Sequence, residues 1–353
     1  MAMQPPSDVF PVRDSHRFNE QGLVRFMESS VDGYQGPLTV LQFQGGQSNP
    51  TYFLQDARRQ YVLRRKPPGK LLPSAHAVDR EYRIITALST TDVPVARSYA
   101  LCEDPEVIGT AFYVMAYVPG RIFLDPLMPG IAPGERRAIV DAMNDVLARI
   151  HKVDYKALGL EDFGRPGNYF ERQIGRWSKQ YRASETQHIE PMEKLMDWLP
   201  KHIPPDDETT IAHGDYRLGN MIIHPNKPEV SAVLDWELCT LGHPLADLGY
   251  NCMMYRFDHE TLDGFKGVDL AALNYPSEEE YVAAYCRRTG RDNIPDWEFY
   301  LAFSVFRVAA ISQGIMGRVR DGTSNNPLAE ERGRRAPKLA QVAWDIIAPI
   351  AGR

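Results

Sequence analysis

The sequence has few cysteines, and no two of them are spaced as in a metal site or a redox centre. Its 353 residues include four cysteines that lie far apart, Cys102, Cys239, Cys252 and Cys286. A disulfide framework needs several paired cysteines, and a structural zinc site usually contains a C-x-x-C pair. The sequence therefore predicts free thiols in a reducing compartment, and we expect a cytoplasmic protein.

An excess of positive charge is also missing. The chain contains 40 Lys and Arg against 46 Asp and Glu, a net charge of −6, and its isoelectric point is about 5.9. Nucleic acids and anionic membranes attract proteins through a positive field. The composition therefore indicates that neither is a partner, and an anionic ligand would need a local cluster of basic side chains.

Long apolar segments are absent as well. The first 20 residues contain no apolar core like that of a signal peptide. The most apolar run, Phe299 to Ile311, carries Arg307 and is shorter than the roughly 20 residues of a membrane span. We predict that this run forms a buried helix. A chain of 353 residues with no internal repeat suits two globular domains.

Strand signals concentrate in the first third of the chain. Short runs rich in β-branched and aromatic residues predict strands over 38–43, 51–54, 61–65, 94–96 and 111–118. A helix is expected over 75–88, and Pro119 with Gly120 ends the last strand. We predict a β-rich N-terminal lobe over residues 1–118, of which 1–20 form an extension.

The remainder of the chain, residues 119–353, has mostly helical periodicity. Helices are predicted over 136–151, 169–182, 278–289, 297–318 and 337–347. Short extended runs interrupt them at 210–213, 221–224 and 231–234. The predicted fold class is α+β, with a small β-rich lobe and a larger, mostly helical lobe that carries the catalytic and substrate residues.

Two polar motifs carry the strongest chemical signal. Asp215 and Asn220 lie in the segment H-G-D-Y-R-L-G-N, and Asp235 lies in V-L-D-W-E fifteen residues further on. Two carboxylates and an amide oxygen form an all-oxygen set that suits Mg²⁺ beside a phosphate. In phosphoryl transfer, one Asp accepts the proton of the attacking hydroxyl. Alternatively, Asp215 and Asn220 form an Asx-type turn and Asp235 caps a helix.

These paired motifs resemble the aminoglycoside phosphotransferase/choline kinase superfamily, whose members are related to protein kinases. The resemblance extends over nearly the whole chain and implies a bilobal protein-kinase-like fold. It implies an ATP-dependent small-molecule kinase, with Asp215 as the catalytic base and Asn220 and Asp235 as ligands of Mg²⁺. It also implies that His213 is a buried organiser of the catalytic loop and does not bind a metal.

The N-terminal lobe supplies candidates for nucleotide binding. Gln47, Ser48 and Asn49 follow two glycines between predicted strands, where backbone N–H groups can approach phosphates. A plain hairpin turn is the alternative. Arg64 stands on the third strand, where kinases usually have Lys, and Leu63 alternates to the opposite face. Solvated charges at a sheet edge are the alternative for Arg64.

Glu81 is the expected partner of Arg64. It falls on an apolar stripe of the predicted helix, where a carboxylate is costly unless it meets a cation. A surface position at the edge of the stripe is the alternative. The resemblance further implies a hinge in which Ala116 and Val118 contact adenine through their backbone and Met115 lines the pocket.

Basic side chains in the helical lobe bear on the acceptor. Basic side chains form two clusters, one around Arg176 and one around Arg318. Each cluster is either an anion site or a solvated helix face. The segments 165–173, 315–318 and 322–324 resemble the kinase-like domain of the acyl-CoA dehydrogenase 10/11 group. That resemblance implies a hydroxy acid or hydroxyacyl-CoA as acceptor, and a separate acyl-CoA dehydrogenase-type enzyme in the same pathway. An aminoglycoside- or choline-type kinase and a non-catalytic nucleotide-binding scaffold are the alternatives.

Overall fold

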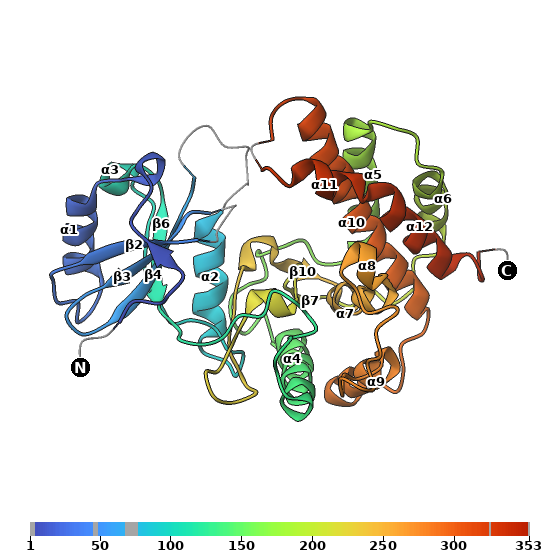
Figure 1. Cartoon of the computed structure of the whole chain (residues 1–353), viewed down its shortest axis with the longest axis horizontal. Helices are drawn as coiled ribbons and strands as arrows, with labels where there is room; N and C mark the ends of the chain where they lie inside the picture. Colours follow the sequence, from blue (N-terminus) through green and yellow to red (C-terminus); the bar gives the residue numbers. More distant parts are fainter. Residues whose placement is uncertain (1–3, 45–48, 68–76, 325, 352–353) are drawn as a thin grey trace. The chain divides into compact units, whose positions relative to one another are not determined.

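The structure is a computed structural model that describes residues 4–44, 49–67, 77–324 and 326–351 (Figure 1). The chain divides into two compact units. The first consists of residues 1–126 and 219–239, and the second of 127–218 and 240–353. This division differs from the predicted lobes, because the segment 219–239 belongs with the N-terminal strands.

An antiparallel six-stranded sheet forms the centre of the first unit. Its strands are ordered β1-β2-β3-β4-β6-β5. Their bounds are Val9–Phe10 (β1), Thr39–Phe43 (β2), Thr51–Gln55 (β3), Gln60–Arg65 (β4), Ser98–Cys102 (β5) and Phe112–Ala116 (β6). The predicted strands therefore exist, although the run predicted from Pro94 becomes a strand only at Ser98.

The N-terminal residues belong to this sheet. Val9 pairs with Phe43 and Phe10 with Gln42, so β1 continues the sheet beyond β2. The predicted extension over residues 1–20 is therefore part of the first unit from β1 onward. No sequence pattern marks β1, because it is only two residues long.

Helices cover both faces of the sheet (Figure 1). The first unit contains α1 (Glu20–Ser30), α2 (Val78–Leu88) and α3 (Pro105–Ile108). Leu23 and Met27 of α1 pack in one core with Tyr61 and Leu63 of β4. Helix α2 contacts β5 and β6, and its residues Ile84 and Leu88 are buried. Alternation along β4 thus sends Leu63 to the α1 side and Arg64 to the α2 side.

A hairpin completes the first unit. It consists of β8 (Met221–Ile223) and β9 (Val230–Val233), followed by a 3₁₀ turn at Trp236–Leu238. The backbone N–H of Val233 donates to the carbonyl of Pro94 at 2.9 Å, and Ile223 bridges to Arg121. These bonds attach the two motif ends, at 220 and 235, to the unit that contains the sheet.

The second unit is mostly helical. Its helices are α4 (Pro133–Lys152), α5 (Tyr169–Ser184), α6 (Glu190–Trp198), α7 (Pro244–Cys252), α8 (His259–Leu262), α9 (Glu278–Thr289), α10 (Trp297–Arg320), α11 (Ala329–Arg334) and α12 (Ala336–Ile347). Two short antiparallel strands, β7 (Thr210–Ala212) and β10 (Thr240–Gly242), pair within it. All five predicted helices of this region are present.

Helix α10 is the central element of the second unit, and α5, α7, α11 and α12 pack around it (Figure 1). Among the described residues it is the one helix that has the length and apolar composition of a membrane span, and 78% of its most apolar window is buried inside the protein. The prediction of a buried helix over Phe299 to Ile311 is therefore confirmed.

Candidate active site

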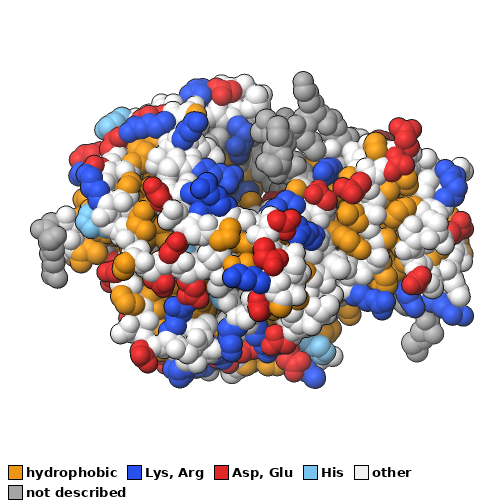
Figure 2. All heavy atoms as spheres, turned by 180° about the vertical axis from the view of Figure 1, so that it is seen from behind, with side chains coloured by type: hydrophobic (Ala, Val, Ile, Leu, Met, Phe, Trp, Pro, Cys, Tyr) orange, Lys and Arg blue, Asp and Glu red, His pale blue; other side chains and the backbone are white. Residues whose placement is uncertain are grey.

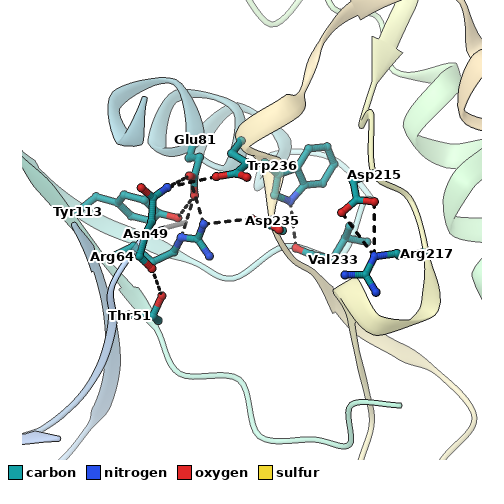
Figure 3. Close-up of polar contacts among 11 residues, drawn as sticks. Asn49, Thr51, Arg64, Glu81, Tyr113, Asp215, Arg217, Val233, Asp235 and Trp236 are labelled. Carbon is teal, nitrogen blue, oxygen red and sulfur yellow. Dashed lines mark hydrogen bonds and ion pairs between the residues drawn. The ribbon is translucent and has the colours of Figure 1, made fainter. Parts of the chain in front are cut away.

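An ion pair between β4 and α2 lies at the centre of the polar network in the first unit (Figure 3). Nε of Arg64 is 2.9 Å from Oε2 of Glu81, and Nη2 of Arg64 donates to Oε1 at 3.3 Å. The side chains are only 13% and 2% exposed, respectively. The structure thus contains the predicted Arg64–Glu81 pair, with the guanidinium on the expected face of β4.

Neutral donors satisfy the rest of the Glu81 carboxylate. Nδ2 of Asn49 donates to Oε1 at 2.9 Å, and the hydroxyl of Tyr113 donates to Oε2 at 2.9 Å. Burial and the negative charge of Glu81 raise the pKa of Tyr113 well above its ordinary value, so the phenol stays protonated. Burial by itself would lower the pKa of Arg64, but Glu81 and its neighbours raise it. The Arg64 guanidinium therefore stays charged.

Asp235 joins this network directly after β9. Its Oδ1 lies 3.1 Å from Nη2 of Arg64, so one guanidinium contacts two carboxylates. The backbone of Asp235 is in the left-handed region, with φ of 65°. Such a conformation is uncommon outside glycine and concentrates where a side chain must be aimed. The side chain is 33% exposed, which leaves it accessible.

Asn220 lies beside Asp235 in the first unit. The N–H of Leu234 donates to the carbonyl of Asn220 at 2.8 Å, which continues the pairing of β8 with β9 by one residue. The two candidate metal ligands thus project from neighbouring chain segments. A carboxylate and an amide are hard oxygen donors of the kind that Mg²⁺ prefers, so this donor set fits that ion.

Asp215, the predicted base, belongs to the second unit. Its Oδ1 accepts a hydrogen bond of 2.5 Å from the hydroxyl of Tyr250 on α7. Nε of Arg217 is 3.4 Å from the same oxygen and 3.5 Å from Oδ2. Burial and the nearby Asp215 raise the pKa of Tyr250, which keeps the phenol a donor. The Asp215 side chain is 20% exposed, so a substrate can reach it.

The backbone before Asp215 is fixed by buried side chains. The carboxylate of Asp247 accepts the N–H groups of His213 at 2.5 Å and Gly214 at 2.8 Å. Burial by itself would raise the pKa of Asp247, but the hydrogen bonds from His151 and from the N–H of Gly214 lower it. His213 is fully buried, and its Nδ1 accepts the N–H of Asp215 at 3.2 Å. This contact suits the predicted organising role.

The predicted nucleotide contacts lie in the loop before β3 and at the end of β6. Gln47 and Ser48 lie outside the described residues, and Asn49 is buried and points to Glu81. The N–H of Ala116 donates to the carbonyl of Arg97 at 2.8 Å, so an adenine contact at Ala116 would use its carbonyl.

At the end of β6, Met115 is 8% exposed and Val118 is partly exposed. Their predicted roles stay predictions.

The basic side chains in the cluster around Arg318 are largely paired with acidic ones. Arg320, Arg334 and Arg335 form ion pairs with Asp321, Glu330 and Asp263, respectively. These charges are therefore largely neutralised within the protein. Charges of both signs also alternate over the face drawn in Figure 2.

Arg176 and Arg318, the two predicted substrate residues, are exposed on α5 and α10. Within the described part of the chain, neither side chain forms a hydrogen bond or an ion pair.

Some residues of the network had no role in the sequence prediction. Tyr113, Asp247 and Tyr250 hydrogen-bond the motif residues from 30 or more positions away in the chain. No local pattern marks these contacts. Arg307 also belongs to this network, because its Nη2 donates to the carbonyl of Gly214 at 2.6 Å. The sequence contained a signal for it, since a single charge inside an otherwise apolar run implies a specific partner.

Known proteins resemble this chain in sequence and in fold. Residues 39–303 match the model of the family described as "Phosphotransferase enzyme family". The chain belongs to this family. This membership confirms the predicted enzyme class, a phosphotransferase with a hydroxyl acceptor. The predicted superfamily and the kinase-like fold class are confirmed as well.

Several relatives are much longer proteins. The chain is 48% identical over 339 residues to acyl-CoA dehydrogenase family member 10 of Mus musculus, a match over 95% of this chain and 32% of that protein. It is 41% identical over 326 residues to acyl-CoA dehydrogenase family member 11 of Homo sapiens, over 91% of this chain and 42% of that protein. The chain thus spans less than half of each relative.

Solved structures show the same fold. A Ralstonia eutropha protein described as a candidate aminoglycoside phosphotransferase is 52% identical, with a TM-score of 0.88 over 94% of this chain and 99% of that chain. Choline kinase of Cryptosporidium parvum is 12% identical, with a TM-score of 0.65 over 94% of this chain and 98% of that chain. This second likeness concerns the fold alone.

Proposed function

We propose that this member of the phosphotransferase enzyme family is an ATP-dependent small-molecule kinase. The γ-phosphoryl group of ATP would pass to a hydroxyl of the acceptor. The bond between the γ-phosphorus and the bridging oxygen breaks, a new bond to the acceptor oxygen forms, and ADP leaves. The hydroxyl proton passes to the carboxylate of Asp215.

The Arg64 guanidinium carries this proposal, because it contacts both Glu81 and Asp235. In protein kinases a strand Lys pairs with a helix Glu beside a metal-binding Asp, and all three act on the nucleotide phosphates. Arg64 occupies the place of that Lys. Its planar fork can bind carboxylate and phosphate oxygens at once.

Each motif residue takes one task. Asn220 and Asp235 would hold Mg²⁺, which when bound neutralises charge on the phosphates. Asp215 would accept the hydroxyl proton, and the Tyr250 hydrogen bond fixes the orientation of its carboxylate. Asp215 and Asn220 are five residues apart in one segment, so the sequence couples the base to the metal ligands.

Nucleotide binding draws support from more distant structures. The aminoglycoside phosphotransferase APH(4)-Ia is described in ternary complexes with hygromycin B and either ADP or AMP-PNP. The same fold supports ATP as the donor here. Met115, Ala116 and Val118 would border its adenine, with Gln47, Ser48 and Asn49 near its phosphates.

For the acceptor we propose a hydroxy acid or a hydroxyacyl-CoA. The relatives at 41–48% identity are named acyl-CoA dehydrogenase family members, and the chain matches less than half of each. A separate acyl-CoA dehydrogenase-type enzyme would then process the phosphorylated product. An aminoglycoside acceptor is the competing proposal, because the 52% identical Ralstonia protein carries that description.

ADP release with MgATP tests these proposals. Hydroxy acids, hydroxyacyl-CoAs, choline and kanamycin are compared as acceptors, with Asp215→Ala as the control that should abolish the stimulated rate. Stimulation by a hydroxy acid or its CoA thioester alone supports the proposed acceptor. Stimulation only by kanamycin or choline contradicts the acceptor class. Nucleotide binding without stimulation by any acceptor would instead favour a non-catalytic scaffold.

A further inference from the structure

Three metal-ligating side chains lie close together where α5 is joined to α6 (Figure 1). Glu185 follows α5 directly, His188 lies in the connecting segment, and Glu193 is in the first turn of α6. One ligand atom from each of the three lies within 4.8 Å of the other two. A tetrahedral metal ion with bonds of about 2.1 Å holds its ligand atoms about 3.4 Å apart, so side-chain movements of about 1 Å would close the set.

The donor atoms of this group indicate which kind of ion fits. An imidazole nitrogen beside carboxylate oxygens suits Zn²⁺ and its neighbours among the transition metals, whereas Mg²⁺ binds almost entirely through oxygen. The group therefore differs in chemistry from Asn220 and Asp235, which offer oxygen alone. It also belongs to the second unit, while those two residues belong to the first.

Helix α10 holds the backbone that carries Glu185. Nε2 of Gln313, which is fully buried, donates to the carbonyl of Ser184 at 2.7 Å and to Oγ1 of Thr186 at 2.9 Å. Nη1 of Arg320 donates to the carbonyl of Glu185 at 3.0 Å. The backbone is thus fixed on both sides of this carboxylate. A ligand that is already in place costs less to order when an ion binds.

A buried hydroxyl without an acceptor borders the same group. Tyr181, one helical turn before Glu185, is fully buried, and its hydroxyl has no acceptor among the residues that the structure describes. Burial and the charges of Glu185 and Glu193 raise the pKa of Tyr181 to about 12, so the hydroxyl keeps its proton beside these two carboxylates. A buried donor without an acceptor is costly. Side chains just outside a metal site usually donate to its ligands, and this hydroxyl has the place of such a donor.

Arg182 contacts both carboxylates from the solvent side. Its two Nη atoms pair with the carboxylate of Glu193, and Nη1 is 3.5 Å from Oε2 of Glu185. The Arg182 side chain is 49% exposed, and ion pairs of this kind contribute little to stability. A metal ion can therefore replace the guanidinium, which would move into solvent.

We propose that Glu185, His188 and Glu193 form a Zn²⁺ site that links the end of α5 to α6. A water molecule would complete the four ligands, and the Tyr181 hydroxyl would donate to one of them. The ion would stabilise the second unit whether or not the protein is a kinase.

Zn²⁺ titration of the full chain tests the site, after dialysis against EDTA. We expect calorimetry to show one high-affinity Zn²⁺ per chain. With free Zn²⁺ at about 100 times its Kd, Tm should rise by about 3–5 °C. Co²⁺ in place of Zn²⁺ should give the visible absorption of a four-coordinate ion. No binding, or binding of Mg²⁺ as tight as that of Zn²⁺, would overturn the inference.

Two histidine variants locate the ion. His188 is exposed, so His188→Ala should fold normally, and its Zn²⁺ affinity should fall by more than the roughly 10–100-fold that loss of an outer hydrogen bond costs. His224→Ala, in the first unit, is the matched control and should bind Zn²⁺ as the wild type does. Equal affinities in both variants would place the ion elsewhere and overturn the inference.

Two further variants change the surroundings of the site. Arg182→Met removes the competing cation, and Zn²⁺ affinity should rise by about fivefold, the equivalent of an exposed ion pair. Lys194→Met, whose lysine pairs with Glu190, is the control and should change the affinity little. Tyr181→Phe should lower the affinity by about tenfold. Unchanged affinity in Arg182→Met would contradict these carboxylates as ligands, and unchanged affinity in Tyr181→Phe would contradict the role of the hydroxyl.

Discussion

Two carboxylates of this protein lie in contrasting surroundings. Glu81 in the first unit is 1% exposed and accepts hydrogen bonds from a guanidinium, an amide and a phenol. Asp215 in the second unit is partly exposed, and its short hydrogen bond comes from a neutral phenol. A carboxylate fully paired with a cation fixes the position of that cation. Asp215 also has a cation nearby, Arg217, but at the longer distance of 3.4 Å and on an exposed side chain, so its carboxylate is less enclosed than that of Glu81.

The largest effect should follow from removing the proposed proton acceptor, Asp215. Asp215→Asn keeps the size and the hydrogen-bonding ability of the side chain, but it cannot act as the base. We expect kcat to fall by about 10²–10⁴-fold, with MgATP affinity largely retained. Steady-state kinetics and calorimetric titration of MgATP measure the two quantities. Turnover close to that of the wild type would show that Asp215 is not the base, and that the two carboxylates do not differ in this respect.

Asp235→Asn is the matched change in the first unit. It removes the negative charge of a candidate metal ligand that Arg64 also contacts, and keeps one side-chain oxygen. We expect nucleotide affinity to become weaker and less dependent on Mg²⁺, which Asp215→Asn should not cause. Mg²⁺-dependent binding that survives Asp235→Asn unchanged would argue against a metal site at this residue.

Next in size is the loss of the buried ion pair. Glu81→Gln leaves the Arg64 charge without its main partner, and we expect the free energy of unfolding to fall by about 3 kcal/mol. In a double-mutant cycle with Arg64→Met, the coupling energy should be about 1–3 kcal/mol, for both stability and ATP use. Denaturant titrations and kinetics supply these values. Additive effects would show that the pair does not act as a unit.

Acid should weaken the second unit through His243. This side chain is buried, and burial lowers its pKa to about 4. Its Nδ1 accepts the N–H of Leu245 at the start of α7, so protonation would break that cap. Because the unfolded His binds a proton near pH 6.5 and the folded one does not, stability falls as the pH drops from about 6.5 to 4.

The full loss is about 3 kcal/mol, the free-energy equivalent of the pKa difference. Urea titrations at pH 7.5 and pH 4.5 measure most of it. His243→Asn keeps a side chain that can cap α7 but does not titrate in this range, so its pH dependence should be smaller. An equal slope in both proteins would exclude His243 as the cause.

The smallest effect is expected for Tyr250→Phe. This change removes the short hydrogen bond to Asp215 and keeps the ring that contacts Arg307. We expect kcat to fall by about tenfold, since a hydrogen bond to a charged group contributes about 1.5–3 kcal/mol. The KM for ATP should not change. Tyr255→Phe, on the same chain segment with its hydroxyl on Pro276, is the control.

The sequence predicted the elements that have long periodic or β-rich patterns. The strands around Arg64 and five helices of the second unit were predicted within a few residues of their bounds. Helices α1, α6 and α7 were missed, as were the short helices α3, α8 and α11. Helix α7 begins in a Gly-His-Pro segment that favours a turn, and its apolar residues do not form a single stripe. It is buried on most sides, which removes the amphipathic signal.

The candidate site also has a part that the sequence predicted and a part that it did not. Asp215, Asn220 and Asp235 are local motifs, and the Arg64–Glu81 pair follows from strand alternation and helix periodicity. These properties repeat within a few residues, so the sequence by itself determined them. Which side chains orient the motif residues is a different question.

Only the tertiary structure decided that Tyr250 reaches Asp215, that Asp247 holds the loop backbone, and that Arg307 contacts the rings of Trp177 and Tyr250. These contacts join residues from 33 to 130 positions apart. They depend on how α5, α7 and α10 pack, which no local period encodes. The sequence thus determined the reactive groups and their spacing, whereas packing selected the neighbours that orient them.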